Sequence, residues 1–436
     1  MAVAAATGRT FARADPHVVL AAAATLVVAA EAAYSHAASD AWLALEVLLA
    51  AVGLLYAWRE QERLRLAPLL ALAFAFQLAY TVVHLGFDVR SDFDSRVLFK
   101  RYGNQLLDGE YPEAEYPVGA VLLFGFEAWI SGGATRVANA FTMIPFQLLL
   151  VGAVWALRTQ TAAWLAAVVA FLPLEPYFVE FKFDVVAAAA LAVGIVLARR
   201  ERWGWSGVVL AVGALVKWTP GLAFLVLVVW LVASRLPRAA ARHAVAFVAT
   251  LVAVYVPFLL WQPDAVLHAY TEQGGRDVTG ESIWYLPFRA LGIARFGTHV
   301  SAPADAPGWV NGVATFIQLA VVAGLLVLAV RRRGSLTAAL ALGALTPATF
   351  LLTNRIFSPQ FLLVLVAAWA VAAAVLLRDR REQLVVGVAA GGAAVANAFV
   401  YPYALPHYDQ TWVAASTLLY VSGIALTAWL VVRTQG

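Results

Sequence analysis

Apolar residues fill most of the chain in runs near the length that a helix needs to cross a bilayer, about 20 residues. Polar and charged residues gather in the short segments between these runs. The runs cover residues 18–38, 41–58, 66–85, 137–157, 161–178, 184–198, 205–217, 219–234, 244–262, 310–330, 335–353, 357–377, 384–401 and 412–432. This pattern predicts an all-α, polytopic transmembrane protein with about 12–14 spans.

Arginine clusters between the runs predict the orientation, because cytoplasmic loops of membrane proteins are enriched in Lys and Arg. The clusters are Arg59/Arg63/Arg65, Arg199/Arg200/Arg202, Arg235/Arg238/Arg242, Arg331–Arg333 and Arg378/Arg380/Arg381. All of them lie on one side if both termini are cytoplasmic. We therefore expect a single integral domain, residues 1–436, in the cytoplasmic (plasma) membrane, with two long extracytoplasmic loops at 86–117 and 263–309.

One further apolar segment, residues 118–132, is too short for a comfortable crossing and is bounded by Pro117 and by glycines. A full span here would place every later arginine cluster outside. We therefore predict a half-helix or re-entrant element, which is tolerated where protein or water satisfies its backbone ends.

Composition agrees with a membrane protein and excludes several functions. Of 436 residues, 63% are hydrophobic and 13% charged, against about 25% charged in soluble domains. The net charge of +4 is small and spread over segment ends, so it favours membrane lipid head groups rather than nucleic acid. The chain has no cysteine, which excludes disulfides, zinc–thiolate sites and cysteine nucleophiles.

The first long loop carries paired carboxylates, Asp92 and Asp94, directly before an amphipathic stretch at 97–107 that ends near Gly109. The spacing predicts an interfacial helix lying in the head-group layer. A carboxylate at its start would meet the head group of a lipid-borne substrate. The alternative is that these acids only solvate a loop.

Lysines are rare, and two of them stand beside candidate site residues. Lys182 precedes Asp184 at the outer end of a helix pair, where Asp184 could alternatively be an ordinary helix cap. Lys217 lies in apolar sequence near a hairpin tip. An ammonium there costs roughly 2.5–3.5 kcal/mol unless it reaches water or a partner. Either an anionic ligand or a structural carboxylate would serve.

Two further polar segments are predicted on the outer side. Residues 353–360 include Arg355, Ser358 and Gln360 between two apolar runs, where a helix start beside an arginine could hold phosphate. Residues 273–282 include Arg276 and Glu281 among glycines that permit close backbone approach.

Together these residues suit displacement of a phosphate leaving group from a sugar. A carboxylate would take the proton of the incoming hydroxyl, and Lys and Arg would neutralise the departing phosphate. The chain has no Walker A motif, no GxGxxG after a strand, no HExxH and no GxSxG. Because nucleotide sugars are absent outside the cytoplasmic membrane, the donor would have to be lipid-anchored.

The motifs occur in a specific order: SDFDS, RYGNQLLDGEYP, EYPVGA, KFDVVAAAALAVG, GVVLAVGALVKWTPG, GGRDVTGESIW and NRIFSPQFLL. In this order, over about residues 85–370, the chain resembles glycosyltransferase family 87 of the GT-C superfamily. That superfamily includes polyprenyl-phosphate-mannose-dependent mannosyltransferases. The chain departs from the common pattern at Val118, where Pro is frequent, and at Phe361, where Tyr is frequent.

The resemblance implies an inverting transferase that moves a sugar, mannose above all, from a polyprenyl-phosphate donor to a lipid or glycan acceptor without a required metal. The family's catalytic Asp lies about fourteen residues before a Gly that matches Gly109. Asp94 lies fifteen before it and Asp92 seventeen, so Asp94 is preferred and Asp92 stays open. We expect the donor phosphate at Arg276, Lys217, Arg355 and Lys182, and substrate contacts at Asp184, Glu281, Ser358, Gln360, Glu115 and Tyr116.

Two other classes of function compete with this interpretation. A lipid-linked-sugar transporter or flippase would also be polytopic with buried charges, but inverted repeats with paired broken helices are expected there, and the sequence has no such symmetry. An inactive scaffold would not need the carboxylate pair.

Overall fold

The computed structural model of the protein describes residues 14–87, 93–157, 163–276, 278–290, 309–403 and 410–435. Within these residues the chain is helical and contains no strand. In the described part of the chain, ten stretches are long and apolar enough to span a membrane. Nine of them are α1 (Pro16–Ala37), α2 (Asp40–Arg59), α3 (Leu66–Phe87), α6 (Thr135–Leu157), α12 (Pro237–Trp261), α15 (Trp309–Arg331), α16 (Leu336–Thr353), α18 (Arg380–Val400) and α19 (Gln410–Arg433). The tenth joins the short helix η3 (Pro359–Phe361) to α17 (Leu362–Leu376).

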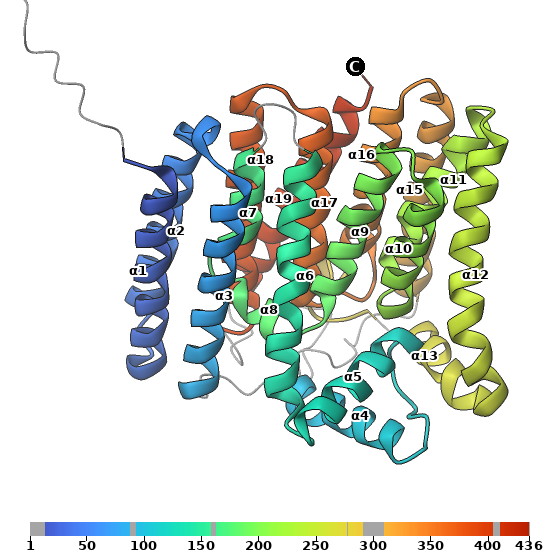
Figure 1. The fold of residues 1–436 in the computed structure, drawn as a ribbon, viewed down its shortest axis with the longest axis horizontal. Coiled ribbons are helices and arrows are strands. Elements are labelled where there is room, and N and C mark those ends of the chain that lie inside the picture. The colour runs from blue at the N-terminus through green and yellow to red at the C-terminus, as the bar shows by residue number, and fades with distance from the viewer. Residues whose placement is uncertain are drawn as a thin grey trace, which may run out of the picture.

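Three shorter helices complete the bundle: α9 (Asp184–Arg199), α10 (Trp203–Val216) and α11 (Thr219–Ala233). The helices stand side by side in Figure 1, with α9 and α17 near the middle and α12 at one edge. In the span ending with α17, 89% of the residues are buried, whereas only 6% are buried in the most apolar 18-residue stretch of α12. The protein core therefore centres on α17, and α12 is left for lipid to cover.

The predicted single span at 161–178 is wrong. The chain instead forms α7 (Ala163–Ala170) and the short α8 (Pro176–Phe181), joined by a non-helical turn. Pro173 and Pro176 prevent a continuous helix because proline lacks the N–H donor and clashes with the preceding turn. Leu174 between them has a positive φ of 64°. An apolar run alone does not reveal such a break.

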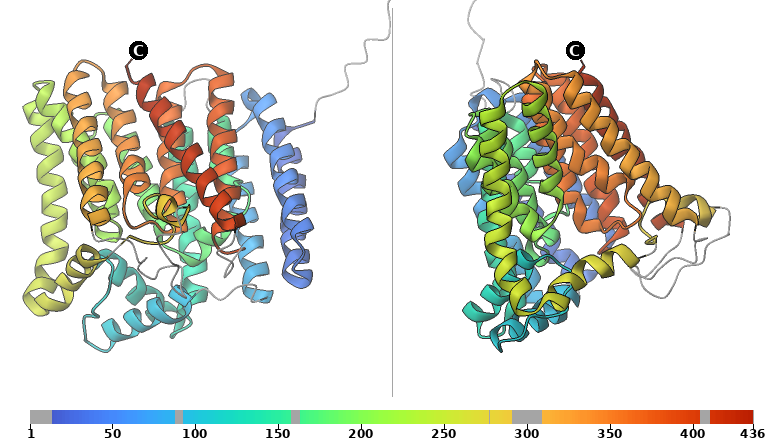
Figure 2. Two further views of the ribbon diagram at one scale, coloured as in Figure 1. Left: turned by 180° about the vertical axis from the view of Figure 1, so that it is seen from behind. Right: turned by 90° about the vertical axis from the view of Figure 1, so that its right-hand side faces the viewer.

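A separate layer covers the end of the bundle opposite the C-terminus (Figures 1 and 2). It holds α4 (Phe99–Leu107), α5 (Val118–Ser131) and α13 (Pro263–Gly275). A π-helical turn, Asp94–Leu98, leads into α4. The predicted helix at 97–107 is thus confirmed, and the segment at 118–132 is a helix that lies against α4 rather than a span.

Close backbone approach joins α4 to α5. A Cβ placed on Gly103 would collide with the carbonyl oxygen of Phe124, so only glycine fits there. Next to it, the rings of Phe99 and Phe124 stack with centroids 4.2 Å apart. The two helices therefore pack tightly against each other, and this packing fixes the position of the turn that carries Asp94.

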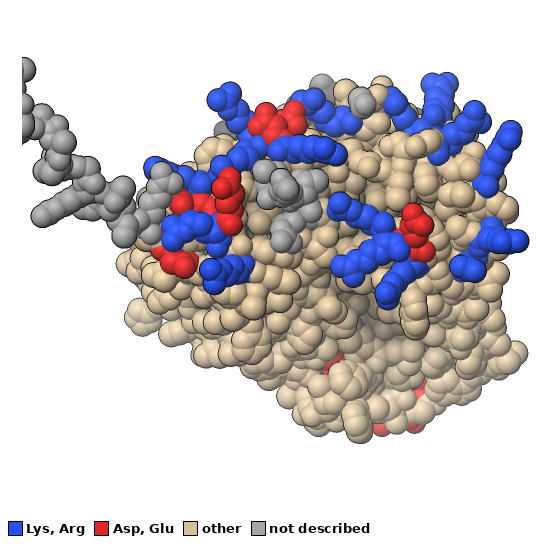
Figure 3. Space-filling view, turned by 45° about the horizontal axis from the view of Figure 1, so that its top comes forward, with Lys and Arg blue, Asp and Glu red and all other residues tan. Residues whose placement is uncertain are grey.

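The predicted gathering of arginines on one face is confirmed. Figure 3 shows Lys and Arg side chains spread over the end of the bundle that carries the C-terminus. Several of them join distant helices: Arg380 donates to the carbonyl oxygens of Trp58 (2.8 Å) and Arg59 (2.9 Å), and Arg433 pairs with Glu382. The shorter links η1 (Gln61–Arg63) and α14 (Tyr285–Ala290) complete the helical elements.

Candidate active site

Asp94 and Lys182 form an ion pair at the junction of the outer layer and the bundle. The Lys182 Nζ atom lies 2.5 Å from the Asp94 Oδ2 atom. Asp94 opens the π-helical turn before α4, and Lys182 occupies the extended residue between α8 and α9. The Asp94 side chain is 27% exposed and that of Lys182 only 6%. The carboxylate can therefore be reached from solvent, while the lysine lies behind it.

A second pair, Asp184 and Lys217, lies beside the first. Asp184 is the first residue of α9, Lys217 follows the last residue of α10, and the Nζ–Oδ1 distance is 2.5 Å. The ammonium also lies 4.3 Å from the ring centroid of Phe361 and 5.3 Å from that of Phe183. Lys217 thus has the structural carboxylate that the sequence left open. Burial lowers the pKa of Lys217, and Asp184 opposes this shift.

The two pairs act on each other electrostatically. Lys182 stabilises the charged form of Asp184, and Asp94 stabilises that of Lys217. We call Asp94, Lys182, Asp184 and Lys217 the four-charge cluster. Two carboxylates and two ammonium groups give the cluster no net charge. Buried charges require such pairing to offset the cost of their desolvation.

Tyr116 forms one wall of this cluster. Its ring packs edge-on against Phe183 at 5.0 Å and Phe124 at 5.8 Å. Burial raises the pKa of its phenol well above the ordinary value, and the charges of Asp94 and Glu115 raise it further. The hydroxyl therefore keeps its proton at neutral pH and can serve only as a neutral donor or acceptor.

Arg276 and Arg355, both predicted to meet phosphate, lie on loops that are tied to each other. Arg276 pairs with Glu115 and lies 3.8 Å from a Glu272 carboxylate oxygen. Arg355 donates to the carbonyl oxygens of Gln273 at 3.2 Å and Gly274 at 2.7 Å. Each guanidinium has protein partners in this state, and Glu115 is the residue next to Tyr116.

The polar segment at 353–360 is fixed by Thr279. The Thr279 backbone N–H donates to the carbonyl of Arg355 at 3.0 Å. The Phe357 N–H donates to the Thr279 hydroxyl at 2.9 Å. Ser358 and the buried Gln360 follow, at the start of η3, and Phe361 then reaches Lys217. This segment therefore connects the arginine loops to the four-charge cluster.

Of the two remaining predicted carboxylates, the structure describes Glu281 but not Asp92. Glu281 is buried, and the hydroxyl of Tyr420 from α19 donates to the Glu281 backbone carbonyl at 2.9 Å. Burial raises the pKa of the Glu281 carboxyl well above its ordinary value. The contacts described for Glu281 do not include the four-charge cluster. Asp92, the other candidate base, lies outside the described residues.

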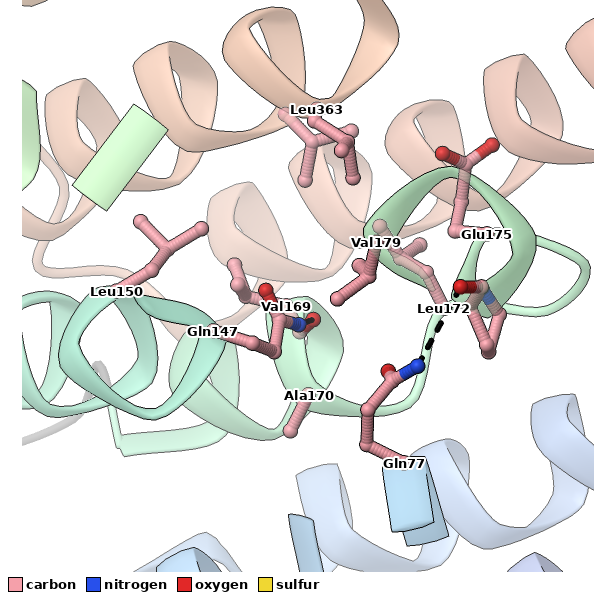
Figure 4. A pocket seen from close by; sticks show the side chains of 11 residues that line it. Gln77, Gln147, Leu150, Val169, Ala170, Leu172, Glu175, Val179 and Leu363 are labelled. Carbon is pink, nitrogen blue, oxygen red and sulfur yellow. Dashed lines mark hydrogen bonds between the residues drawn. The ribbon is translucent and has the colours of Figure 1, made fainter. Parts of the chain in front are cut away.

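Sequence reasoning missed a set of buried polar residues inside or between the spans: Glu31, Glu46, His84, Glu127, Glu175 and Glu180. Ionisable residues within apolar runs are costly and usually functional or paired, so their occurrence was the available signal. Figure 4 shows Glu175 with Gln77 and Gln147 around a cavity of about 20 Å³. Such a volume holds about one water molecule.

Comparison with known protein families shows to which family the chain belongs. The model of glycosyltransferase family 87 matches residues 115–359, more than half of the chain. The chain belongs to glycosyltransferase family 87. It is therefore a membrane glycosyltransferase of GT-C type. A search of curated proteins found no match. The residues matched to family 87 include Glu115, Lys182, Asp184, Lys217, Arg276 and Arg355, and they begin after Asp94.

Proposed function

We propose that the protein is an inverting glycosyltransferase of the extracytoplasmic face that takes its sugar from a polyprenyl-phosphate carrier. The acceptor is a lipid or glycan hydroxyl, and mannose is the sugar that the family resemblance favours. The observation that most directly supports this proposal is the Asp94–Lys182 pair, in which a partly exposed carboxylate meets a buried ammonium. Family membership supports a transferase rather than a flippase.

The position of Asp94 suits a general base for a lipid-borne substrate. It opens the turn into α4, whose buried face holds Phe99 and Tyr102 and whose opposite face exposes Lys100. An amphipathic helix of this kind lies at a membrane interface. The arginine-rich face lies at the other end of the bundle. By the positive-inside rule, the layer with α4 and α5 faces away from the cytoplasm.

The reaction is a single displacement. Asp94 takes the proton of the acceptor hydroxyl as the hydroxyl oxygen bonds to the anomeric carbon. The bond from that carbon to the phosphate oxygen breaks, and polyprenyl phosphate leaves with the electron pair. Attack from the face opposite the phosphate inverts the anomeric configuration. General-base help of this kind contributes about 10²–10⁴-fold to the rate.

Lys182 changes partner during this cycle. Without substrate, its ammonium is paired with the Asp94 carboxylate, which is therefore not free to meet the acceptor hydroxyl. A phosphodiester offers the ammonium a second anion, so donor binding draws Lys182 toward the leaving oxygen and releases Asp94 for the acceptor. The stabilisation is then greatest where charge develops in the transition state, which is the requirement for faster turnover.

Arg276 and Arg355 guide the phosphate or the loop that covers it. Both lie on segments joined to Glu115 and to 353–361, and both have exchangeable bonds to carboxylate or carbonyl oxygens. A guanidinium can replace such bonds with two parallel bonds to phosphate.

The test is a transfer assay with defined donors. The purified protein in lipid nanodiscs is incubated with acceptor lipids and either a short-chain polyprenyl-phosphate mannose or a nucleotide-diphosphate mannose. We expect release of polyprenyl phosphate and a product of inverted configuration only from the first donor. Turnover of the nucleotide sugar, or movement of intact donor without its consumption, would contradict the proposal.

A further inference from the structure

A network of buried polar side chains crosses the apolar bundle beside the candidate site. His84 of α3 lies at its centre, with its Nδ1 atom 2.5 Å from a Glu180 oxygen and its Nε2 atom 2.8 Å from a Glu31 oxygen. His84 is 2% exposed, and both glutamates are fully buried. Two carboxylates on the two ring nitrogens match an imidazolium, the form in which both nitrogens donate. The network therefore joins α1, α3 and α8 by charge-assisted bonds.

Glu180 belongs to α8, the six-residue helix that precedes Lys182, and other side chains hold the same helix. From α3, Thr81 donates to Glu180 at 3.2 Å, and Gln77 donates to the Glu180 carboxylate and to the Pro176 carbonyl, both at 3.3 Å. Figure 4 shows Gln77 reaching toward this segment. From α6, Asn139 donates to the Glu180 carbonyl at 2.7 Å.

Helices of six residues have little stability alone, so their place is set by tertiary contacts. An apolar side chain at position 180 would pack α8 against α3 without burying a carboxylate. The polar contacts instead fix both the direction and the rotation of α8, because each hydrogen bond has a defined geometry.

The consequence reaches Lys182 directly. Its backbone N–H donates to the carbonyl of Phe178 at 3.2 Å, so the lysine continues from the last turn of α8. Its partner Asp94 opens the turn that packs on α4 and α6, and α6 also holds α8 through Asn139. The His84–Glu180 pair is thus a cross-link from α3 to α8 that fixes the segment presenting Lys182.

We propose that His84 and Glu180, supported by Glu31, are positioning residues that hold Lys182 against Asp94. Their part in turnover rests on the proposed function, since the pair matters only if Asp94 and Lys182 act on substrate. Their part in geometry does not depend on it. Loss of the cross-link should let α8 rotate or shift, and displacements of about 1 Å at a reacting group can cost on the order of 10²-fold in rate.

The chain offers a matched control away from α8. The Trp369 indole N–H of α17 donates to the buried Thr427 hydroxyl of α19 at 2.8 Å, so Thr427→Val also removes a buried hydrogen bond within the bundle. The contacts described for Thr427 do not include α3 or α8. Thr81→Val is a milder variant on the active side, because it removes only one hydrogen bond to Glu180.

The first arm of the experiment measures geometry without activity. Because the chain lacks cysteine, Asp94→Cys with Lys182→Cys introduces a single thiol pair for a short bifunctional methanethiosulfonate. We expect His84→Gln and Glu180→Gln to lower the cross-linking rate at least 5-fold and Thr81→Val to lower it at least 2-fold. Thr427→Val should leave the rate unchanged. Unchanged rates in the first three variants would overturn the proposal.

The second arm measures turnover with native Asp94 and Lys182 in nanodiscs, below the melting temperature of every variant. His84→Gln and Glu180→Gln should lower kcat at least 10-fold, and Thr427→Val should stay within 2-fold. If Thr427→Val loses as much kcat as Glu180→Gln, the residues act only through stability, and the proposal fails. If the wild-type protein does not consume the polyprenyl-phosphate sugar, the proposed function fails, while the cross-linking arm still decides the positioning.

Discussion

Lys182 and Asp94 are 88 residues apart in the sequence, yet their charged atoms lie 2.5 Å apart, and the aspartate side chain is partly exposed while the lysine is buried. Asp94→Asn should therefore reduce sugar transfer by about 10²–10⁴-fold, since an amide cannot accept the acceptor's proton. Binding of polyprenyl phosphate and the melting temperature should change little. Radiolabelled sugar transfer from a synthetic lipid-phosphate donor measures the loss.

Asp92→Asn is the companion variant for that assay. If Asp92 is the base, the two phenotypes exchange. Full activity in both single variants and in the double variant would place the base elsewhere, with Asp184 and Glu281 the next carboxylates to test.

Breaking the Asp184–Lys217 pair should lower the stability of the folded protein. Lys217→Met leaves the buried Asp184 carboxylate without its 2.5 Å partner, and breaking a buried pair from one side typically costs about 3–5 kcal/mol. Adding Asp184→Asn removes the orphaned charge and should recover most of that loss. Thermal unfolding followed by tryptophan fluorescence compares the two variants. A double variant less stable than Lys217→Met would show that the pair is not the source of the effect.

Glu127 should make the folding stability of the protein depend on pH. It lies on α5, outside the spanning helices, with its carboxylate fully buried, and burial raises its pKa from 4.5 to about 9. The folded state therefore favours the protonated acid. Stability from this group is complete below pH 4.5 and is lost as the pH rises toward 9, by up to about 1.4 kcal/mol per pH unit.

Glu127→Gln should remove that loss. We expect its melting temperature to exceed that of the wild type at pH 8.5 and to differ little at pH 5. An equal difference at both pH values would mean that Glu127 does not change protonation on unfolding.

The sidedness of the bundle can be checked with single cysteines, because the natural chain has none. An impermeant maleimide added to intact cells should label position 272 and leave position 332 unlabelled until the cells are opened. Glu272 lies on α13 in the outer layer and Arg332 on the arginine-rich face. The reverse labelling pattern would overturn the orientation and with it the proposed extracytoplasmic site.

The sequence predicted the helices better than the contacts between them. Apolar runs and arginine clusters are local signals, so the spans, the helix at 97–107 and the basic face were predictable. The break between α7 and α8 was not, because Leu172 and Leu174 continue the apolar run through the turn. The need of Lys217 for a partner followed from its apolar surroundings, whereas the choice of Asp184 depends on how α9 and α10 pack.

The acids within the spans were missed for a related reason. One Glu in a run of Ala, Leu and Val barely lowers its mean hydropathy, so Glu31 and Glu46 did not interrupt the pattern. His84 similarly looks like a residue near a helix end. Their partners on α3, His84 for Glu31 and Tyr80 for Glu46, become visible only when the helices are packed together.

The sparse burial of α12 has a consequence for how the enzyme responds to its surroundings. One face of this helix packs on α10, where the His243 carbonyl lies against Gly207, but only 6% of its most apolar 18 residues are buried in protein. A change in bilayer thickness therefore acts directly on α12, because helices adjust their tilt to the bilayer around them. Its last residue, Trp261, is followed within two residues by α13, which leads to Arg276 and its contact with Glu115. Reconstitution in a series of lipids of increasing chain length should therefore change turnover through this one flank, while the centre of the bundle keeps its packing.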